Sequence, residues 1–324
     1  MDNFLIKDWQ KQKPKAMRDG FGQSLLELAG QYQDLVVLTA DLAQSTRVAE
    51  FSRKFPRRFF QLGVAEQNLI GVAAGLALAG KMPVCTSFAS FLIGRAWEQI
   101  RICLAANRLP VKIIGSHAGL SHPADGFTAQ ATEDIALVNC LPYFKIIYPA
   151  DFNQLKTIFP AVLKDPGPVY LRITREPTAV FIQEQAVLKI GQAQVLKEGR
   201  EVTIISAGPL LAEVLLAAES AAKQGISCEV VNLATIKPLD QATLLKSIKK
   251  TGCFLTVEDH QTQGGLGAAV GRIVVKNQPV PGGIIGLENR FGQTAREYRQ
   301  LLREYGLTAE AILKAIKKLV KRKK

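Results

Sequence analysis

The sequence predicts an α/β protein of two consecutive domains, each a mostly parallel sheet flanked by helices. Short strand-like apolar runs alternate with longer segments whose apolar residues recur at helical spacing. Such alternation implies a parallel sheet that is covered by helices on both faces. Residues 175–190 show no clear periodicity, contain Pro177 and separate two blocks of this kind. The length of 324 residues suits two domains of ordinary size, and the 48% hydrophobic content is sufficient for two cores.

The first block alternates between helices and strands from its start to its end. We expect its helices over residues 22–32, 67–79, 95–106 and 152–163. The strands are expected over residues 35–39, 83–87, 111–115, 144–148 and 169–173.

The second block also alternates between strands and helices, although no internal repeat relates it to the first. Its strands are expected over residues 202–206, 227–232, 253–258 and 284–287. Helices are expected over residues 210–224 and 241–250, with a closing amphipathic helix over residues 309–318. The predicted division is an N-terminal extension (1–15), a first domain (16–180), a linker (181–190) and a second domain (191–324).

A glycine-rich run lies at residues 264–271, where a phosphate loop could be suspected. Its spacing does not fit the dinucleotide fingerprint, and no strand runs directly into it. Close packing of a helix therefore explains these glycines better than a phosphate site.

The cysteines and the hydropathy pattern bear on the compartment. None of the five cysteines shows C-x-x-C spacing and most lie in apolar runs, so we expect buried free thiols in a reducing environment. The sequence has neither a signal peptide nor an apolar run of transmembrane length. These observations favour a cytoplasmic protein with no membrane partner.

The net charge of +13 does not indicate nucleic-acid binding, because much of the excess lies at the two ends. The basic ends, residues 7–15 and 314–324, lack the interleaved aromatic residues of a single-strand-binding surface. We expect solvated basic tails, the last of which could be disordered, with some attraction for phosphorylated metabolites.

Glu66 lies between two apolar stretches and is the first candidate for acid–base chemistry. Residues 70–78 downstream are almost all glycine, alanine and aliphatic residues, and residues 35–39 upstream are a predicted strand. A carboxylate in such a setting would have its charged form disfavoured and could hold and move a proton. Spacing alone leaves the alternative open that Glu66 is exposed and caps the first turn of a helix that begins near Gln67.

Several separate motifs in a fixed order resemble the pyrimidine-binding domain of transketolases. They are Arg18, Ala40-Asp41-Leu42, Ser45, Gly63-Val64-Ala65-Glu66-Gln67-Asn68, residues 88–101, and Ser116-His117 followed by Asp125-Gly126. The second block resembles the transketolase C-terminal domain in Thr256-Val257-Glu258-Asp259-His260 and Gly264-Gly265-Leu266-Gly267. The resemblance covers residues 16–316, almost the whole chain.

This resemblance implies thiamine diphosphate as the cofactor, with Glu66 as the catalytic carboxyl group. A carboxylic acid bonded to N1′ of the aminopyrimidine helps the cofactor lose its C2 proton, and Glu66 stands at the matching position. Phe88 and Phe91 match an apolar wall for the pyrimidine, although two core phenylalanines at helical spacing are the ordinary alternative. Asp41 matches a structural carboxylate on the pyrimidine side.

The resemblance also implies a set of sugar-phosphate contacts. Asp125 matches the carboxylate that reads substrate hydroxyl groups. Arg18, Ser45, His117 and Arg175 match positions that hold the acceptor's phosphate, for which a planar guanidinium is well suited. Taken singly, each charged residue could equally be a solvated surface group.

Two departures from the family pattern stand out. Most transketolases carry histidine four residues after the position of Asp125, whereas this chain has Ala129, which cannot hydrogen-bond through its side chain. His122 could partly replace that imidazole, or could be a loop histidine without a role. The consequence expected is an altered substrate range or activity, with the proton-transfer machinery unaffected.

The second departure is that no G-D-G metal motif occurs anywhere in the chain. The carboxylate and amide ligands expected for a cation that bridges a diphosphate therefore have no candidate. We expect a separate N-terminal transketolase subunit to hold the diphosphate and its Mg²⁺ or Ca²⁺. Because the family builds its sites across subunit interfaces, an α2β2 assembly is expected.

Three alternatives remain beside a split transketolase that moves a two-carbon ketol unit from a ketose phosphate to an aldose phosphate. One is the beta subunit of a 2-oxoacid dehydrogenase decarboxylase component, which has a similar length. A second is deoxyxylulose phosphate synthase, which normally keeps both halves in one chain. The third is a non-catalytic partner that regulates another transketolase chain, for which Ala129 is the only hint.

Overall fold

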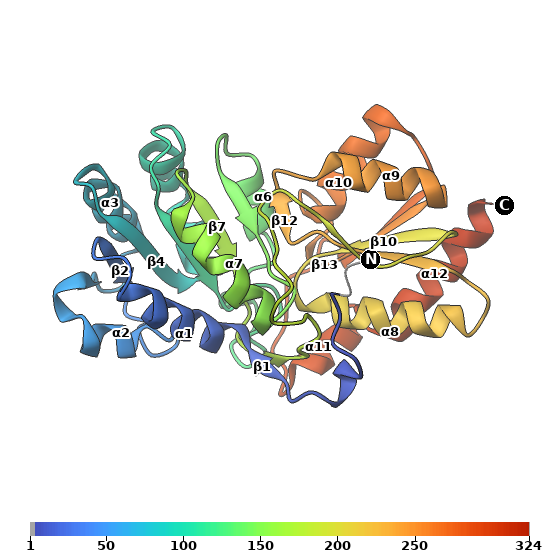
Figure 1. Cartoon of the computed structure of the whole chain (residues 1–324), viewed down its shortest axis with the longest axis horizontal. Coiled ribbons are helices and arrows are strands. Elements are labelled where there is room, and N and C mark those ends of the chain that lie inside the picture. Colours follow the sequence, from blue (N-terminus) through green and yellow to red (C-terminus); the bar gives the residue numbers. More distant parts are fainter. Residues whose placement is uncertain (1–3, 324) are drawn as a thin grey trace.

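A computed structural model describes residues 4–323 and confirms the predicted two α/β domains, which lie side by side along the longest axis (Figure 1). The first domain is built on a seven-stranded sheet in the order β12-β6-β7-β5-β4-β2-β3. Its strands are β2 (Leu35–Thr39), β3 (Phe59–Gln61), β4 (Met82–Phe88), β5 (Lys112–Ser116), β6 (Lys145–Ile147), β7 (Val169–Arg172) and β12 (Thr235–Lys237). All neighbours in this sheet are parallel except β12, which pairs antiparallel with β6.

The helices of the first domain include the four segments that the sequence predicts and further segments that it does not. They are α1 (Met17–Ala29), α2 (Ala49–Lys54), α3 (Glu66–Leu78), α4 (Ala89–Arg95), α5 (Trp97–Gln99), α6 (Asp134–Asn139) and α7 (Phe152–Lys164). The predicted helix at residues 95–106 is broken into the end of α4, the short α5 and a π-helical turn, Ile100–Ala105.

The second domain is built on a five-stranded sheet in the order β14-β13-β10-β11-β9. Its strands are β9 (Gln194–Lys197), β10 (Val202–Ser206), β11 (Cys228–Asn232), β13 (Phe254–Gln261) and β14 (Gly282–Leu287). Only β9 is antiparallel to its neighbour. The helices are α8 (Leu211–Ala222), α9 (Gln241–Thr251), α10 (Leu266–Asn277), α11 (Tyr298–Glu304) and α12 (Ala309–Lys323).

The two domains are joined by a shared sheet edge and by a buried ionic group. Strand β12 comes from the sequence of the second domain yet completes the sheet of the first. Arg172, fully buried at the end of β7, donates to Asp134 of the first domain at 2.8 Å and to Asp259 of the second at 2.7 Å. One guanidinium thus contacts two buried carboxylates, and the group ties β7 to β13.

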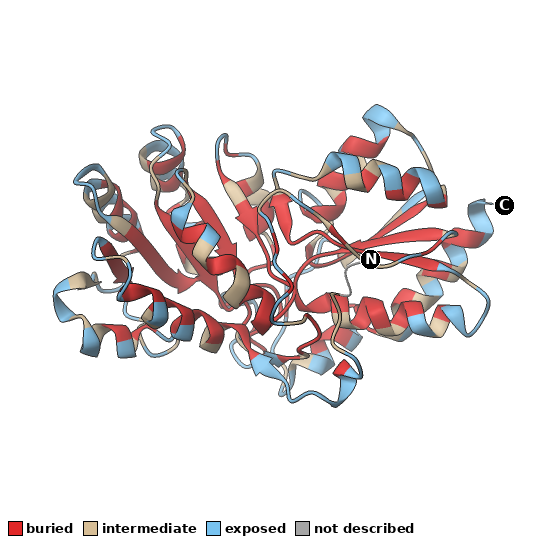
Figure 2. Ribbon diagram, viewed as in Figure 1, coloured by how far each residue is buried: buried red, intermediate tan, exposed pale blue. Residues whose placement is uncertain are grey.

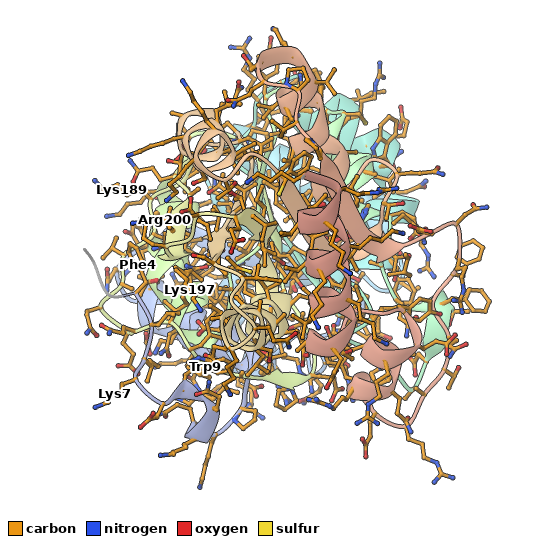
Figure 3. All side chains as sticks on the ribbon, turned by 90° about the vertical axis from the view of Figure 1, so that its right-hand side faces the viewer. Phe4, Lys7, Trp9, Lys189, Lys197 and Arg200 are labelled. Carbon is orange, nitrogen blue, oxygen red and sulfur yellow. The ribbon has the colours of Figure 1, made fainter. Side chains whose placement is uncertain are left out.

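The N-terminal segment is not the solvated tail that the sequence suggests. Trp9 is 7% exposed and packs edge-on against Phe181, with ring centroids 5.7 Å apart. The short strand β1 (Lys15–Ala16) pairs antiparallel with β8 (Pro177–Thr178). Leu5 forms an antiparallel bridge with Ile182, so the predicted extension lies along the start of the predicted linker. Figure 3 shows Phe4 and Trp9 on the same side of the molecule as the basic residues Lys7, Lys189, Lys197 and Arg200.

The C-terminal basic segment is likewise ordered, which corrects the expectation of a loose tail. Helix α12 continues to Lys323, five residues beyond the predicted end, while Lys324 lies outside the described residues. The amino group of Lys323 reaches the backbone carbonyl groups of Glu201 and Thr251. The apolar face of α12, with Ile312 and Ile316 fully buried, packs against the second domain.

Burial follows the layered architecture, with buried strands between half-buried helices (Figure 2). All five cysteines are free, and Cys85, Cys228 and Cys253 are buried as predicted. Cys103 is half-buried and Cys140 is exposed. Among residues 4–323, no helix combines the length and the apolar character needed to cross a bilayer.

The glycine-rich run serves helix packing, as the sequence predicts. A Cβ at Gly267 would lie 2.6 Å from Ile284, so the start of α10 can approach β14 only without a side chain there. The carboxyl group of Glu258 accepts from the backbone nitrogens of Leu266 and Gly267 at 2.6 and 2.9 Å. It thereby caps the free N–H groups at the start of α10.

Candidate active site

The predicted site residues gather at the carboxyl ends of the parallel strands of the first domain. Phe88 ends β4, His117 directly follows β5, and Arg175 lies three residues after β7. Asp41 follows β2, and Glu66 begins the helix that follows β3. Since β3, β2, β4, β5 and β7 are consecutive neighbours, the five residues form a row along one edge of the sheet, the usual place for a ligand in this fold class.

Glu66 is 3% exposed and is the first residue of α3. This confirms the predicted burial and excludes an exposed capping residue. Its setting is not simply apolar, however, because Arg95 Nη1 lies 3.2 Å from both carboxylate oxygens. The Arg95 guanidinium also lies over the ring of Phe91, 4.3 Å from the centroid. One planar cation thus contacts both the carboxylate and the neighbouring aromatic face.

Phe91, Phe88 and His117 form a continuous stack. The rings of Phe91 and Phe88 are 5.3 Å apart and inclined by 28°, and the rings of Phe88 and His117 are 3.8 Å apart and inclined by 26°. Phe88 is buried, whereas Phe91 is only half-buried. Because His117 covers one face of Phe88, Phe91 is the ring of this pair that has more surface for a ligand.

His117 is held as a neutral imidazole in an unusual backbone conformation. Its φ of 60° lies in the left-handed region, which is uncommon outside glycine and frequent at functional sites. Ser116 Oγ lies 2.9 Å from Nδ1, which leaves Nε2 for another partner. Burial, with further contributions from His122 and Arg18, lowers the pKa of His117 to about 2.

Three guanidinium groups converge near His117. Burial is the main cause of a lowered pKa at Arg18, and the nearby charges of Arg47 and Arg175 lower it further. Arg18 donates from Nη1 to the backbone carbonyl of Ser45 at 3.1 Å, and its Nε is buried without a hydrogen-bond partner within residues 4–323. Arg47 is paired with Asp19 at 2.6 Å. Such a concentration of positive charge suits an anionic group.

Asp125 lies next to this cluster in the loop after β5. Its carboxylate Oδ2 is 2.9 Å from Nε2 of His122, and its side chain is 54% exposed. The ring of His122 is buried and meets Phe88 edge-on, with centroids 5.6 Å apart. His122 therefore connects Asp125 to the aromatic stack, whereas the buried Ala129 contributes only its backbone carbonyl, which accepts from Ser90.

Two predicted residues reach the site through their backbones. The Asp41 nitrogen donates to Gln61 Oε1 at 2.7 Å, and Asp41 has a φ of 59°, while its side chain is exposed. Ser45 contributes its carbonyl to Arg18. No hydrogen bond of either side chain is found among the described residues.

Arg47 and Arg95 belong to the site but were not predicted from the sequence. Arg95 stands four residues after Phe91, which is the spacing of neighbours on one helix face and a usable signal. Arg47 follows Ser45 by two residues, but its approach to Arg18 depends on α1 packing beside the loop after β2. The position of Arg47 could not be found from local pattern alone.

A divalent metal does not fit this chain. Within residues 4–323, no group of three or more His, Cys, Asp or Glu side chains is arranged to hold a metal ion. Glu66 is instead paired with Arg95, and Asp125 with His122.

Comparison with known proteins matches both domains. The family model described as "Transketolase, pyrimidine binding domain" matches residues 13–179, and that described as "Transketolase, C-terminal domain" matches residues 191–312. A "Putative transketolase C-terminal section" of Methanocaldococcus jannaschii is 42% identical over 317 residues, covering 95% of this chain and 97% of that protein.

Two further relatives are of similar length. The "6-deoxy-6-sulfo-D-fructose transketolase subunit SqwH" of Clostridium sp. (strain MSTE9) is 39% identical, covering 95% of each chain. A solved structure described as "Split gene transketolase, inactive beta4 tetramer" superposes with a TM-score of 0.88 at 39% identity, covering 95% of this chain and 99% of that chain. The chain therefore belongs to the transketolase family, as the C-terminal half of a split transketolase.

Proposed function

We propose that this chain is the pyrimidine-binding subunit of a thiamine-diphosphate-dependent transketolase, transferring a two-carbon ketol unit from a ketose phosphate to an aldose phosphate. The observation that carries the proposal is the contact of one planar cation with both Glu66 and Phe91. An N1′-protonated aminopyrimidine is also a planar cation, and its N1′–H is a donor to a carboxylate. A pocket that satisfies the guanidinium of Arg95 therefore has the chemistry that the cofactor ring requires.

Glu66, Phe88 and Phe91 would hold the aminopyrimidine, with Asp41 on the same side of the sheet edge. When bound, thiamine diphosphate supplies a carbon nucleophile for the substrate carbonyl. Glu66 would hold a proton at N1′, and its burial keeps water away from that proton. The stacked rings of Phe88 and Phe91 would fix the plane of the pyrimidine.

The sugar phosphate would lie beside this position, against the cationic cluster. Arg18, Arg175 and the neutral Nε2 of His117 would bind the phosphate, and the Ser45 segment would hold Arg18 in place. Arg47 adds a third guanidinium. Asp125 would accept hydrogen bonds from sugar hydroxyl groups. The name of the Clostridium relative refers to a sulfonated sugar, so the donor of this chain need not be a phosphate ester.

A second protein would complete the enzyme in the cytoplasm. The described residues hold no metal cluster, so the partner N-terminal subunit would bring Mg²⁺ or Ca²⁺ and the diphosphate site. The exposed stripe of α3, formed by Gln67, Gly71, Gly75 and Leu78, borders Glu66 and would allow another chain to approach closely. The description of the solved relative as an inactive β4 tetramer supports self-association, and an α2β2 assembly with the partner.

The test is reconstitution. Co-expression with the N-terminal subunit from the same source should give a complex that transfers a ketol unit from xylulose 5-phosphate, or from another ketose phosphate or sulfonate in a donor panel, to ribose 5-phosphate. The chain alone should neither turn over nor bind thiamine diphosphate tightly by calorimetry. Tight Mg²⁺-dependent binding by the single chain would refute the need for a partner. A stable complex without transfer from any donor would favour a regulatory role.

A further inference from the structure

The loop between β5 and α6 holds a second imidazole next to the predicted hydroxyl-reading carboxylate. His122 Nε2 lies 2.9 Å from Asp125 Oδ2, and the His122 side chain is 8% exposed against 54% for Asp125. One end of this pair is therefore fixed inside the protein while the other faces the solvent side of the site. A carboxylate has further lone pairs, so Asp125 can still accept from a ligand.

The tautomer of His122 follows from its surroundings. Nδ1 is buried and has no hydrogen-bond partner among the described residues, so a proton there would be an unpaired buried donor. Burial lowers the pKa of His122, and the Asp125 charge only partly opposes this. The neutral form with the proton on Nε2 fits both facts, and it makes His122 the donor and Asp125 the acceptor.

The backbone that carries the pair is clamped by the second domain. The Gln130 amide nitrogen donates to the carbonyl of His122 at 3.2 Å and to that of Gln293 at 3.1 Å. The nitrogen of Ala295 donates to the carbonyl of Pro123 at 2.9 Å. The second domain thus fixes the backbone at Pro123 directly, and it is linked to the backbone at His122 through Gln130.

Gly126, directly after Asp125, completes the clamp. Its φ of 68° is readily adopted only by glycine, and a Cβ there would lie 2.7 Å from Thr294 Oγ1. The Asp125 carboxylate is therefore placed by a side-chain donor on one side and by a tight backbone contact on the other.

We propose that His122 is a positioning residue, which orients the Asp125 carboxylate toward the hydroxyl groups of the sugar substrate. The inference rests on the proposed function and deepens it. It explains how the substrate loop keeps an imidazole beside Asp125 although residue 129 is alanine. It also gives the second domain a role, because its segment 293–295 holds the loop that bears the pair.

The test uses the reconstituted complex and a matched set of substitutions. The amide nitrogen of His122→Gln can reach the place of Nε2, whereas that of His122→Asn reaches only the place of Nδ1. His122→Phe keeps the aromatic packing and removes the bond. We expect KM for the ketose donor to rise about tenfold in the Asn and Phe variants and to stay within about threefold in the Gln variant, with kcat nearly unchanged. In the Asp125→Asn background, His122→Phe should cause no further rise.

Two readouts separate this inference from the proposed function. Nitrogen NMR of the imidazoles in the chain itself needs no activity and should show the Nε2–H tautomer of His122, with a changed signal in Asp125→Asn. Thermal unfolding checks that each variant folds. A wild-type KM in His122→Phe, equal defects in the Gln and Asn variants, or an Nδ1–H tautomer would overturn the role of His122. Absence of transfer by the wild-type complex, with the expected NMR result, would count against the proposed function alone.

Discussion

Arg95 donates from a single nitrogen, Nη1, to both carboxylate oxygens of Glu66. Arg95 is half exposed while Glu66 is buried, so the guanidinium enters the pocket from the solvent side. The same guanidinium lies over Phe91. Arg95 and an aminopyrimidine would therefore compete for the same two groups, and the side chain has solvent into which it can move.

Replacing Arg95 by alanine should tighten cofactor binding to the reconstituted complex. A half-exposed ion pair contributes about 0.2–1 kcal/mol, so the apparent Kd of thiamine diphosphate should fall by a factor of about 1.4 to 5. Isothermal titration calorimetry at a fixed Mg²⁺ concentration measures this Kd. Arg101→Ala, an exposed arginine further along the same segment, is the control and should change little. Weaker binding by Arg95→Ala would mean that Arg95 holds the cofactor rather than competing with it.

Substitutions of Glu66 should separate proton transfer from binding. Glu66→Gln keeps a polar contact but cannot deliver a proton, and kcat of the complex should fall by about 10²–10⁴-fold. Glu66→Asp places the carboxyl group about one methylene short and should retain part of the activity. Steady-state kinetics with a coupled assay check both. Unchanged turnover in Glu66→Gln would remove the carboxyl group from the mechanism.

Much of the fold follows from the sequence because its parallel strands are short apolar runs. The predicted strands at residues 35–39 and 202–206 coincide with β2 and β10. The edge strands β9 and β12 were missed, since each is short and antiparallel, and β12 acquires its partner from another domain. The packing of the N-terminal segment was also missed, because the role of Trp9 depends on Phe181, far away in the sequence.

The sequence predicts which residues form the site but not how their side chains contact one another. Glu66, Phe88 and His117 lie along one sheet edge because the motifs that mark them follow consecutive strands. The ion pair of Glu66 with Arg95 and the bond of His122 with Asp125 depend on side-chain directions that motifs do not encode. The roles of Asp41, Ser45 and the others remain predictions.

The stability of the chain should decrease as the pH falls below about 6.5. Burial lowers the pKa of all three histidines, His117, His122 and His260. The unfolded chain then binds protons that the folded chain does not, so the free energy of unfolding falls with decreasing pH, by up to about 1.4 kcal/mol per pH unit for each histidine. For His117 this window extends down to about pH 2. Urea unfolding at a series of pH values measures the slope.

The titration of Glu258 opposes the histidine effect on stability, so the histidine effect has to be measured with a variant. Burial raises the pKa of Glu258 to about 8, so its protonated form stabilises the folded chain and this contribution is lost as the pH rises. The histidine effect is therefore read as the difference in slope between the wild type and His117→Asn. A variant slope equal to that of the wild type would contradict a neutral His117 in the folded state.

Removing Arg172 should destabilise both domains together. Arg172→Met leaves Asp134 and Asp259 as buried carboxylates without their cation, which costs about 3–5 kcal/mol. Arg172→Lys should recover only part of this stability, because one ammonium group cannot reproduce the contacts of the guanidinium with both carboxylates. Thermal unfolding should show a single lowered transition. Two separate transitions in the wild type would show that Arg172 does not couple the domains.

Strand β12 has a consequence for exchanging parts between relatives. It is encoded between β11 and α9 of the second domain, yet it forms an edge of the first sheet. A chimera joined within residues 181–190 would pair a sheet from one parent with an edge strand from another, and Arg172 with a foreign Asp259. A crossover within this linker keeps neither contact native. The natural module for recombination is therefore the pair of domains, and neither domain can be transplanted by itself.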